Sequence, residues 1–306
     1  MEKTQKNYEY FNKCPICAYT ALRTFRKSTF DLDLLTRERI KITDADYGKT
    51  WSLSLCEKCG YVFANPCPSA DLIRSLYSGI IDPLYEEEAQ GRSKNFIPIL
   101  SFLEKIHPEK GPLFDVGAAT GILLNLARNR GWETDGIEAS SWAVELAAQK
   151  YNLNIRKGNF ESASLKSNYY KAVTMVDIIE HVSHPFEAVV KTYEILAPGG
   201  ILCIVTPDIK SITAKITDGK WWHFRPAHIG YYSLKSLSFL LHRTGFKIIK
   251  IRKYNWTFSA NYIISRISGL KYLLKNTELA SFCKRIPIKL VLGDSLEIYT
   301  RKDLQR

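Results

Sequence analysis

The chain has 306 residues, of which 45% are apolar and 24% charged, so it can bury a substantial core and is not mainly disordered. No apolar run approaches the roughly 20 residues of a membrane span, and the first residues lack the apolar segment of a secretory signal. We therefore expect a cytoplasmic, reducing setting, in which the seven cysteines are thiols or metal ligands.

The formal net charge is +12, and the basic surplus lies near the C-terminus. Residues 243–306 contain 14 basic and 4 acidic side chains. This excess favours an anionic partner, such as a phosphate-bearing substrate, nucleic acid or lipid headgroups. A solvated basic face with no dedicated partner is the alternative.

Two cysteine pairs predict a zinc ribbon in residues 1–66. The pairs are Cys14 with Cys17 and Cys56 with Cys59. Two such turns supply four thiolates for one tetrahedral ion, which suits a structural Zn²⁺. Between the pairs we expect a small metal-stabilised sheet built from the β-rich stretches 20–25, 38–42 and 50–55. Four unrelated cytosolic thiols are the alternative.

Residues 67–110 are expected to form a helical linker. Ser69 is a suitable N-cap for a helix through Tyr77, and Ser93 is a suitable N-cap for a helix to about Ile106. Proline and glycine at 108–111 break this pattern, so we place the boundary of the main domain, residues 111–306, there.

The main domain begins with alternating strands and helices, which predict an α/β sheet. A strand at 113–116 leads into a turn of small residues, and a second strand ends at Glu138. Small residues let the backbone of a turn approach a ligand, and an acidic residue at the end of the second strand can bind ribose hydroxyls. The sequence therefore predicts a nucleoside site at this edge.

The turn sequence D-V-G-A-A-T-G, which begins at Asp115, resembles motif I of the class I S-adenosylmethionine (SAM)-dependent methyltransferases. Further matches follow in the family's order: N-F-E at 159–161, a strand at 170–176, and L-A-P-G-G at 196–200 before a fifth strand. A final strand at 295–301 resembles the reversed last strand of that fold. The resemblance implies a Rossmann-like methyltransferase domain. An NAD-type Rossmann domain is the alternative, although its third glycine falls at a different offset.

The resemblance also implies SAM as the cofactor and assigns roles by matching positions. Asp115 would be one of the cofactor-binding residues, and Gly117, Ala119 and Gly121 after it would form the floor under the methionine portion. The remaining cofactor contacts implied are Glu138 on the ribose diol, Asn159 and Phe160 beside the adenine, and Asp177 near the reacting end.

Residues 175–185 are similar to the ubiquinone-biosynthesis type of O-methyltransferase, in which an acid-x-x-Glu-His set is associated with a divalent metal and substrate hydroxyls. The matching residues here are Asp177, Glu180 and His181. A helical turn would put all three on one face. His181, alone or with a metal, would then take a proton from the acceptor. The alternative is that Glu180 and His181 only cap and orient the segment.

Residues 221–232 combine many aromatic side chains with two histidines and one arginine. They resemble the H-F-x-P-x-H-x-x-Y-(F/Y)-S stretch of the same broad family, with His228 at the usual histidine. We expect a loop that forms a substrate wall, followed by a helix capped by Ser233. A packed aromatic loop is the alternative.

Residues 254–290 are expected to be a basic helical insertion before the last strand. Such an amphipathic segment can lie on an anionic membrane surface, making the protein peripheral to it, cover the active site or pack on a partner subunit. An ordinary lid or core-packing helix is the alternative.

Together these features predict SAM-dependent methyl transfer to a small-molecule, sugar or lipid-linked acceptor, most simply O-methylation. A zinc ribbon ahead of the domain is similar to sugar methyltransferases. An RNA methyltransferase that binds RNA through the ribbon and the basic region is the alternative. No N-P-P-Y-type motif follows the fourth strand, which disfavours nucleic acid as the substrate. A non-catalytic SAM-binding protein is a third hypothesis.

Overall fold

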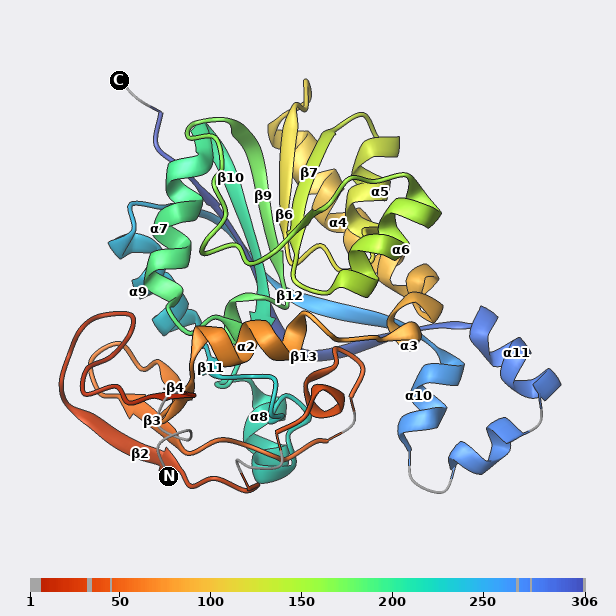
Figure 1. Cartoon of the computed structure of the whole chain (residues 1–306), viewed down its shortest axis with the longest axis horizontal. Helices are drawn as coiled ribbons and strands as arrows, with labels where there is room; N and C mark the ends of the chain where they lie inside the picture. Colours follow the sequence, from red (N-terminus) through yellow and green to blue (C-terminus); the bar gives the residue numbers. More distant parts are fainter. Residues whose placement is uncertain (1–6, 32–34, 45, 268–269, 276, 305–306) are drawn as a thin grey trace.

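The computed structural model describes residues 7–31, 35–44, 46–267, 270–275 and 277–304. Its centre is a mixed sheet of seven strands in the order β12-β13-β10-β9-β6-β7-β8 (Figure 1). Strands β8, β7, β6, β9 and β10 are parallel, and β13 is antiparallel to both β10 and β12. The predicted Rossmann-like sheet with a reversed last strand is thus confirmed. Its strands are β6 Pro112–Val116, β7 Glu133–Glu138, β8 Arg156–Lys157, β9 Tyr170–Val176, β10 Leu196–Pro207, β12 Lys247–Ser259 and β13 Pro287–Arg301.

Helices cover both faces of this sheet because successive side chains of a strand point to opposite sides. Leu113 and Ala172 pack in one core with α4 and α5, whereas Phe114 and Val173 pack in a second core with α7 and α9. Two apolar layers therefore hold the sheet edge in place. The helices of this part are α4 Ala89–Ile106, α5 Ile122–Asn129, α6 Ser141–Tyr151, α7 Pro185–Ile195 and α9 Leu234–Arg243.

The N-terminal segment forms a small sheet of its own, in the order β11-β4-β3-β2. Strand β11 comes from the distant aromatic loop and pairs antiparallel with β4. A separate pair, β1 with β5, joins the start of the chain to the linker. These strands are β1 Tyr8–Glu9, β2 Leu22–Arg26, β3 Leu53–Cys56, β4 Val62–Ala64, β5 Cys67–Pro68 and β11 Gly230–Tyr231.

The local predictions for the linker and the ribbon are partly confirmed. Ser69 caps α2 (Ala70–Tyr77), and Ser233 caps α9. The helix expected after Ser93 instead begins at Ala89, and Ser93 donates a hydrogen bond back to the Ala89 carbonyl. The strand expected at 38–42 is also wrong, because a 3₁₀ helix, η2 (Arg37–Ile40), occupies that region.

Strands β12 and β13 continue past the sheet as a two-stranded ribbon that ends in a projecting arm (Figure 1). The arm contains α10 (Ala260–Arg266), η5 (Leu270–Lys275) and α11 (Thr277–Arg285). The helical part of the predicted 254–290 insertion is therefore shorter than expected, since residues through Ser259 and from Pro287 are strand. In the described part of the chain, no helix is long and apolar enough to cross a membrane.

Candidate active site

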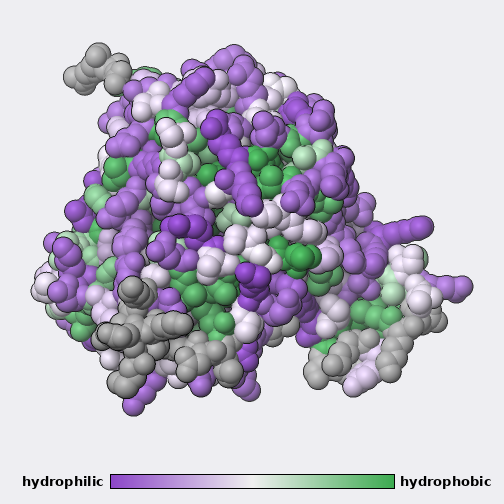
Figure 2. All heavy atoms as spheres, viewed as in Figure 1, coloured by the Kyte–Doolittle hydropathy of each residue, from purple (hydrophilic) through white to green (hydrophobic). Residues whose placement is uncertain are grey.

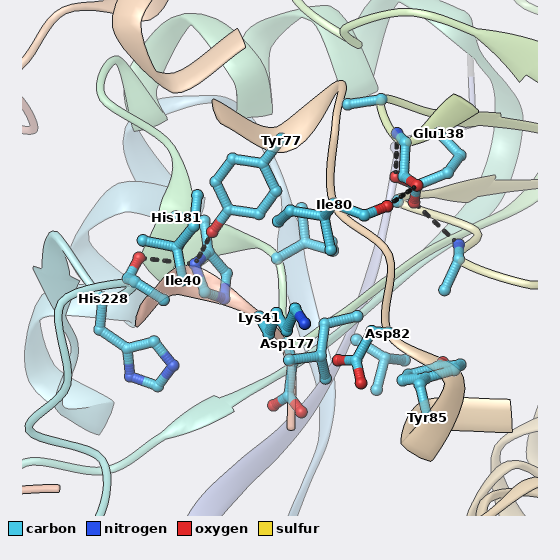
Figure 3. A pocket seen from close by; sticks show the side chains of 18 of the residues that line it. Ile40, Lys41, Tyr77, Ile80, Asp82, Tyr85, Glu138, Asp177, His181 and His228 are labelled. Atoms are coloured by element: carbon cyan, nitrogen blue, oxygen red, sulfur yellow. Dashed lines mark hydrogen bonds between the residues drawn. The ribbon is translucent and has the colours of Figure 1, made fainter. Parts of the chain in front are cut away.

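A cavity of about 760 Å³ lies where the carboxyl ends of β6, β7 and β9 face the N-terminal segment (Figure 3). His181 and His228 line it, whereas Asp115, Gly121 and Glu180 do not. The structure thus brings most of the predicted site residues to one cavity. The predicted cofactor residues in its wall are Gly117, Ala119, Glu138, Asn159, Phe160 and Asp177.

The small residues of the turn after β6 are required by the backbone and by close neighbours. Gly117, Ala119 and Gly121 all have positive φ angles, of 69°, 47° and 81°. A Cβ atom on Gly117 would lie 2.1 Å from Cδ1 of Ile178, and one on Gly121 would lie 2.7 Å from Cδ1 of Leu153. Both glycines therefore hold a left-handed φ that would strain any other side chain, and a Cβ atom would also displace the end of a neighbouring side chain.

Glu138 ends β7 with its carboxylate held by two backbone amides (Figure 3). Oε2 accepts a hydrogen bond from the Ala119 amide at 2.9 Å, and Oε1 accepts one from the Ser140 amide at 2.7 Å. Burial raises the pKa of this carboxyl, and the two amides oppose the shift. The carboxylate oxygens keep lone pairs for a ligand in the cavity.

Asp115 lies just before the turn and does not line the cavity. Its Oδ1 accepts a hydrogen bond from Thr174 Oγ1 at 2.6 Å, which links β6 to β9. Burial raises its pKa to about 7. Asp115 therefore supports the turn from below, although the resemblance placed it among the cofactor contacts.

Asp177, Glu180 and His181 do not share one face, contrary to the expectation from a helical turn. Asp177 has a φ of 53°, and it is followed directly by a short 3₁₀ helix, η3 (Ile179–His181), and not by an α-helical turn. Asp177 consequently faces the cavity, while Glu180 Oε2 accepts a hydrogen bond from Thr206 Oγ1 at 2.9 Å behind the wall. Burial raises the pKa of Asp177 to about 6.

The ring of His181 is oriented by the backbone of the aromatic loop. Its Nδ1 lies 2.7 Å from the Ala227 carbonyl oxygen and 2.9 Å from the Tyr77 hydroxyl (Figure 3). Because a carbonyl oxygen only accepts, Nδ1 carries the proton and Nε2 keeps a free lone pair. Burial lowers the pKa of His181 to about 4, so the ring is neutral near pH 7.

His228 stands next to His181, with ring centroids 4.9 Å apart. Burial lowers its pKa well below the ordinary value, and its Nδ1 has no hydrogen-bond partner among the described residues. Glu180 Oε1 likewise lacks a described partner, and burial raises the pKa of that carboxyl. One ligand atom each of Glu180, His181 and His228 lies within 4.8 Å of the others. His228, and not the predicted Asp177, completes this cluster.

Arg92 is a cavity residue that the sequence reasoning missed. It is only 5% exposed, and its Cζ lies 3.7 Å from the centroid of the Tyr85 ring. Within the described residues its Nε has no hydrogen-bond partner, and its guanidinium forms no ion pair. Its spacing to Phe96 and Ile99 places Arg92 on the apolar stripe of α4. A cation on an apolar stripe was the feature of the sequence that could have identified this residue.

The roof of the cavity combines the N-terminal segment with the aromatic loop. Arg225 donates to the carbonyl oxygens of Lys41 at 2.6 Å and Ile42 at 3.0 Å, and it pairs with Asp44. Arg266 of α10 donates to the Thr43 carbonyl. The residues of the predicted substrate wall that line the cavity are Trp222, His223, Arg225, Ala227 and His228.

The four paired cysteines meet in one cluster. Sγ of Cys14 lies 3.6 Å from Sγ of Cys59, Sγ of Cys17 lies 3.4 Å from Sγ of Cys56, and all four lie within 4.8 Å of one another. All are free thiols, and three are buried. Four sulfur donors converging in this way are the set that suits a tetrahedral ion.

Solved methyltransferase structures resemble the chain at low sequence identity. A possible histamine N-methyltransferase from Thermotoga maritima is 20% identical over 72% of this chain and 96% of its own, with a TM-score of 0.48. A SAM-dependent methyltransferase from Archaeoglobus fulgidus is 20% identical over 72% and 98%, with a TM-score of 0.49. Magnesium protoporphyrin IX methyltransferase from Synechocystis PCC 6803 is 14% identical over 74% and 90%, with a TM-score of 0.49. No curated protein matches the chain.

A family model described as a methyltransferase domain matches residues 85–251, which is more than half of the chain. The matched range contains the turn after β6, Glu138, His181 and His228. The chain therefore belongs to the methyltransferase-domain family and is a SAM-dependent methyltransferase.

Proposed function

We propose that the protein methylates a hydroxyl group of a small-molecule, sugar or lipid-linked acceptor. The observation that carries the proposal is the cluster of Glu180, His181 and His228 at the cavity. A neutral amine already has a lone pair with which to attack a methyl group, whereas a hydroxyl becomes a good nucleophile only as its proton leaves. The neutral imidazoles of His181 and His228, which line the cavity, are groups that can accept this proton.

On the cofactor side, this chain's residues would hold SAM and exclude water. Glu138 would accept hydrogen bonds from the ribose hydroxyls, and Asn159 and Phe160 would flank the adenine. Arg92 would pair with the carboxylate of the methionine portion, since it is a buried cation without a described anion. SAM supplies an electrophilic methyl group on a sulfonium, so the protein has only to align and shield the reacting atoms.

On the acceptor side, His181 would act as the base. The bond from its Nδ1 to the Ala227 carbonyl leaves Nε2 free to accept the hydroxyl proton. The His228 ring, next to it, would hold the acceptor in position. The roof residues that Arg225 clamps would close the cavity over the acceptor.

A divalent metal ion fits this cluster. Glu180 Oε1 and His228 Nδ1 are buried polar atoms without described partners, and a carboxylate with two imidazoles is a donor set that borderline divalent metals accept. In a metal-bound form Glu180, His181 and His228 would hold the ion, with Asp177 outside the set, and Nε2 of His181 would then be a ligand instead of the base. Such an ion supplies Lewis acidity that makes a hydroxyl more acidic.

We also propose that Cys14, Cys17, Cys56 and Cys59 hold a structural Zn²⁺. The four converging sulfur atoms support this assignment, because a four-cysteine site leaves no position open for a substrate. The ion would stabilise a segment whose own sheet has only short strands.

The chemistry of the product tests the proposed function. The full chain is incubated with methyl-labelled SAM and with extracts of polar metabolites, glycans and lipids. We expect label in a product that resists alkali and releases methyl iodide with hydriodic acid, as a methyl ether does. Label released by alkali would identify a methyl ester, and label resistant to both treatments would identify methylation of a carbon or of an amine nitrogen; either result contradicts O-methylation of a hydroxyl.

A further inference from the structure

Large apolar side chains are exposed on the face that carries the arm. Ile212 and Ile216 of α8 (Ile212–Thr217) are 75% and 78% exposed, and Val291 of β13 is 72% exposed. The two elements touch, since Thr213 Oγ1 donates to the Leu292 carbonyl at 2.6 Å. Phe282 extends the apolar surface onto the arm, where it is 62% exposed. Figure 2 shows further hydrophobic side chains on the arm.

This surface reaches the mouth of the cavity at Leu292, the neighbour of Val291. Four large apolar residues line the cavity and are also exposed by more than a third. Their positions mark the mouth between η2, β13 and α10, close to α8. These residues are Ile42 at 39%, Tyr47 at 37%, Ile267 at 45% and Leu292 at 38%. Exposed apolar surface beside the mouth of a binding site is typical of an interaction face.

Basic residues accompany the apolar ones on the same elements. Residues 260–292 contain six basic residues and one acidic residue, and residues 209–222 contain three basic residues and one acidic residue. Lys215, Lys220 and Lys289 are exposed beside the apolar side chains. Apolar residues framed by cations are the combination that binds an anionic lipid surface.

We propose that the face formed by α8, the 287–292 end of β13 and the arm docks on an anionic lipid bilayer. We call it the docking face. Docking would insert Ile212, Ile216 and Val291 at the level of the acyl chains' upper ends, with the lysines at the phosphates. The cavity mouth would then open toward the headgroups. The inference concerns binding alone and does not depend on which atom is methylated.

Charge distinguishes the bilayer from the other partners that such a face fits. Two copies of the chain placed face to face would bring two basic surfaces together, which costs free energy. An RNA partner would satisfy the cations but would leave the exposed isoleucine and valine side chains without an apolar contact. An anionic bilayer satisfies both.

Sedimentation with vesicles tests the proposal. The full chain is mixed with vesicles of phosphatidylcholine alone or with phosphatidylglycerol added, at low and high salt. We expect binding to the anionic vesicles only, with weakening at high salt. The double variant Ile216→Ser/Val291→Ser should lower the partition coefficient at least about tenfold, and Lys215→Glu/Lys289→Glu should lower it by a similar factor.

Matched controls lie at the end of β12 and β13 that is farthest from the arm. Leu304 is 71% exposed, close to the 72% of Val291, and Lys247 is exposed where β12 starts. Leu304→Ser and Lys247→Glu should bind vesicles as the unaltered chain does. Unchanged affinity for S-adenosylhomocysteine verifies that each variant is folded.

Three outcomes would overturn the docking proposal. One is the absence of binding to anionic vesicles at low salt. Another is binding that the docking-face variants retain. The third is that the unaltered chain does not bind vesicles but forms a dimer or binds a polyuridine RNA, and that the docking-face variants abolish this association. Failure of methyl transfer to a hydroxyl would leave the vesicle result unaffected, so the two proposals fail separately.

Discussion

Thr174 Oγ1 donates a hydrogen bond of 2.6 Å to Oδ1 of Asp115 across the neighbouring parallel strands β9 and β6. Even with this bond, burial raises the pKa of Asp115 to about 7. Between about pH 4 and pH 7 the folded chain therefore keeps a proton that the unfolded chain releases. The free energy of unfolding falls as pH rises through that window, because the folded state binds more protons.

Replacing Asp115 with asparagine should remove this pH dependence. Asp115→Asn keeps an acceptor for Thr174 but does not ionise. As pH rises, its free energy of unfolding should therefore increase relative to that of the unaltered chain, by no more than about 4 kcal/mol. Thermal unfolding from pH 5 to pH 8 measures the difference. Asp71→Asn, at a carboxylate 85% exposed, is the control. Parallel curves for Asp115→Asn and the unaltered chain would mean that Asp115 is ionised when folded.

Glu138→Ala should weaken binding of SAM and S-adenosylhomocysteine by roughly 10- to 100-fold, because charge-assisted hydrogen bonds to the ribose are lost. Calorimetry with S-adenosylhomocysteine measures the change. Glu133→Ala is the control, since Glu133 is exposed at the other end of β7. Equal affinities for the two variants would show that Glu138 does not bind the cofactor.

Arg92→Met should weaken S-adenosylhomocysteine binding by roughly 10- to 100-fold through loss of its carboxylate partner. Binding of 5′-methylthioadenosine, which lacks that carboxylate, should not change. Lys94→Met, at an exposed position of the same helix, controls for the substitution. A variant that loses affinity for both nucleosides equally would assign Arg92 a structural role only.

His228→Gln should lower the rate of methyl transfer by about 100-fold or more while leaving S-adenosylhomocysteine affinity unchanged, because His228 belongs to the acceptor side of the cavity. Single-turnover rates together with calorimetry separate these quantities. The exposed His242 of α9 provides the control variant His242→Gln. A loss of cofactor affinity that matches the loss of rate would contradict the acceptor-side role.

Cys56→Ser should lower the zinc content below the one ion per chain that we expect for the unaltered protein, and it should reduce thermal stability. Elemental analysis of the purified chain and thermal unfolding measure both effects. Cys283→Ser changes a buried cysteine outside the cluster and serves as the control. Full zinc content in Cys56→Ser would show that Cys56 is not a ligand.

Local pattern was enough to predict the strand–turn–strand unit that carries the expected cofactor residues. This unit from Asp115 to Glu138 is continuous in sequence, so its strands and turn follow from strand period and turn chemistry, whereas the cofactor roles of its residues come from the family resemblance. The caps Ser69 and Ser233 were predictable for the same reason. The structure has these strands, this turn and both caps close to the predicted residues.

The acceptor half depends on contacts between distant residues and could not be predicted in the same way. Residues 37–40 form a 3₁₀ helix beside carbonyl groups that Arg225 binds from far along the chain. The positive φ of Asp177 turns its side chain away from Glu180, and no local pattern announces that angle. The spacing of Arg92 places it on the apolar stripe of its helix, but only the packing of α5 and β12 against that helix shows that the cation is buried.

The pairing of β11 with β4 joins the aromatic loop to the N-terminal segment. His228 stands two residues before β11, and Cys59 stands three residues before β4. A shortened chain starting at residue 85, where the family match begins, would keep Arg92 and the nucleoside floor but would lose the strand against which the histidine loop rests. Such a fragment should bind the nucleoside and transfer nothing, so methyl transfer requires the N-terminal segment in addition to the domain that its family defines.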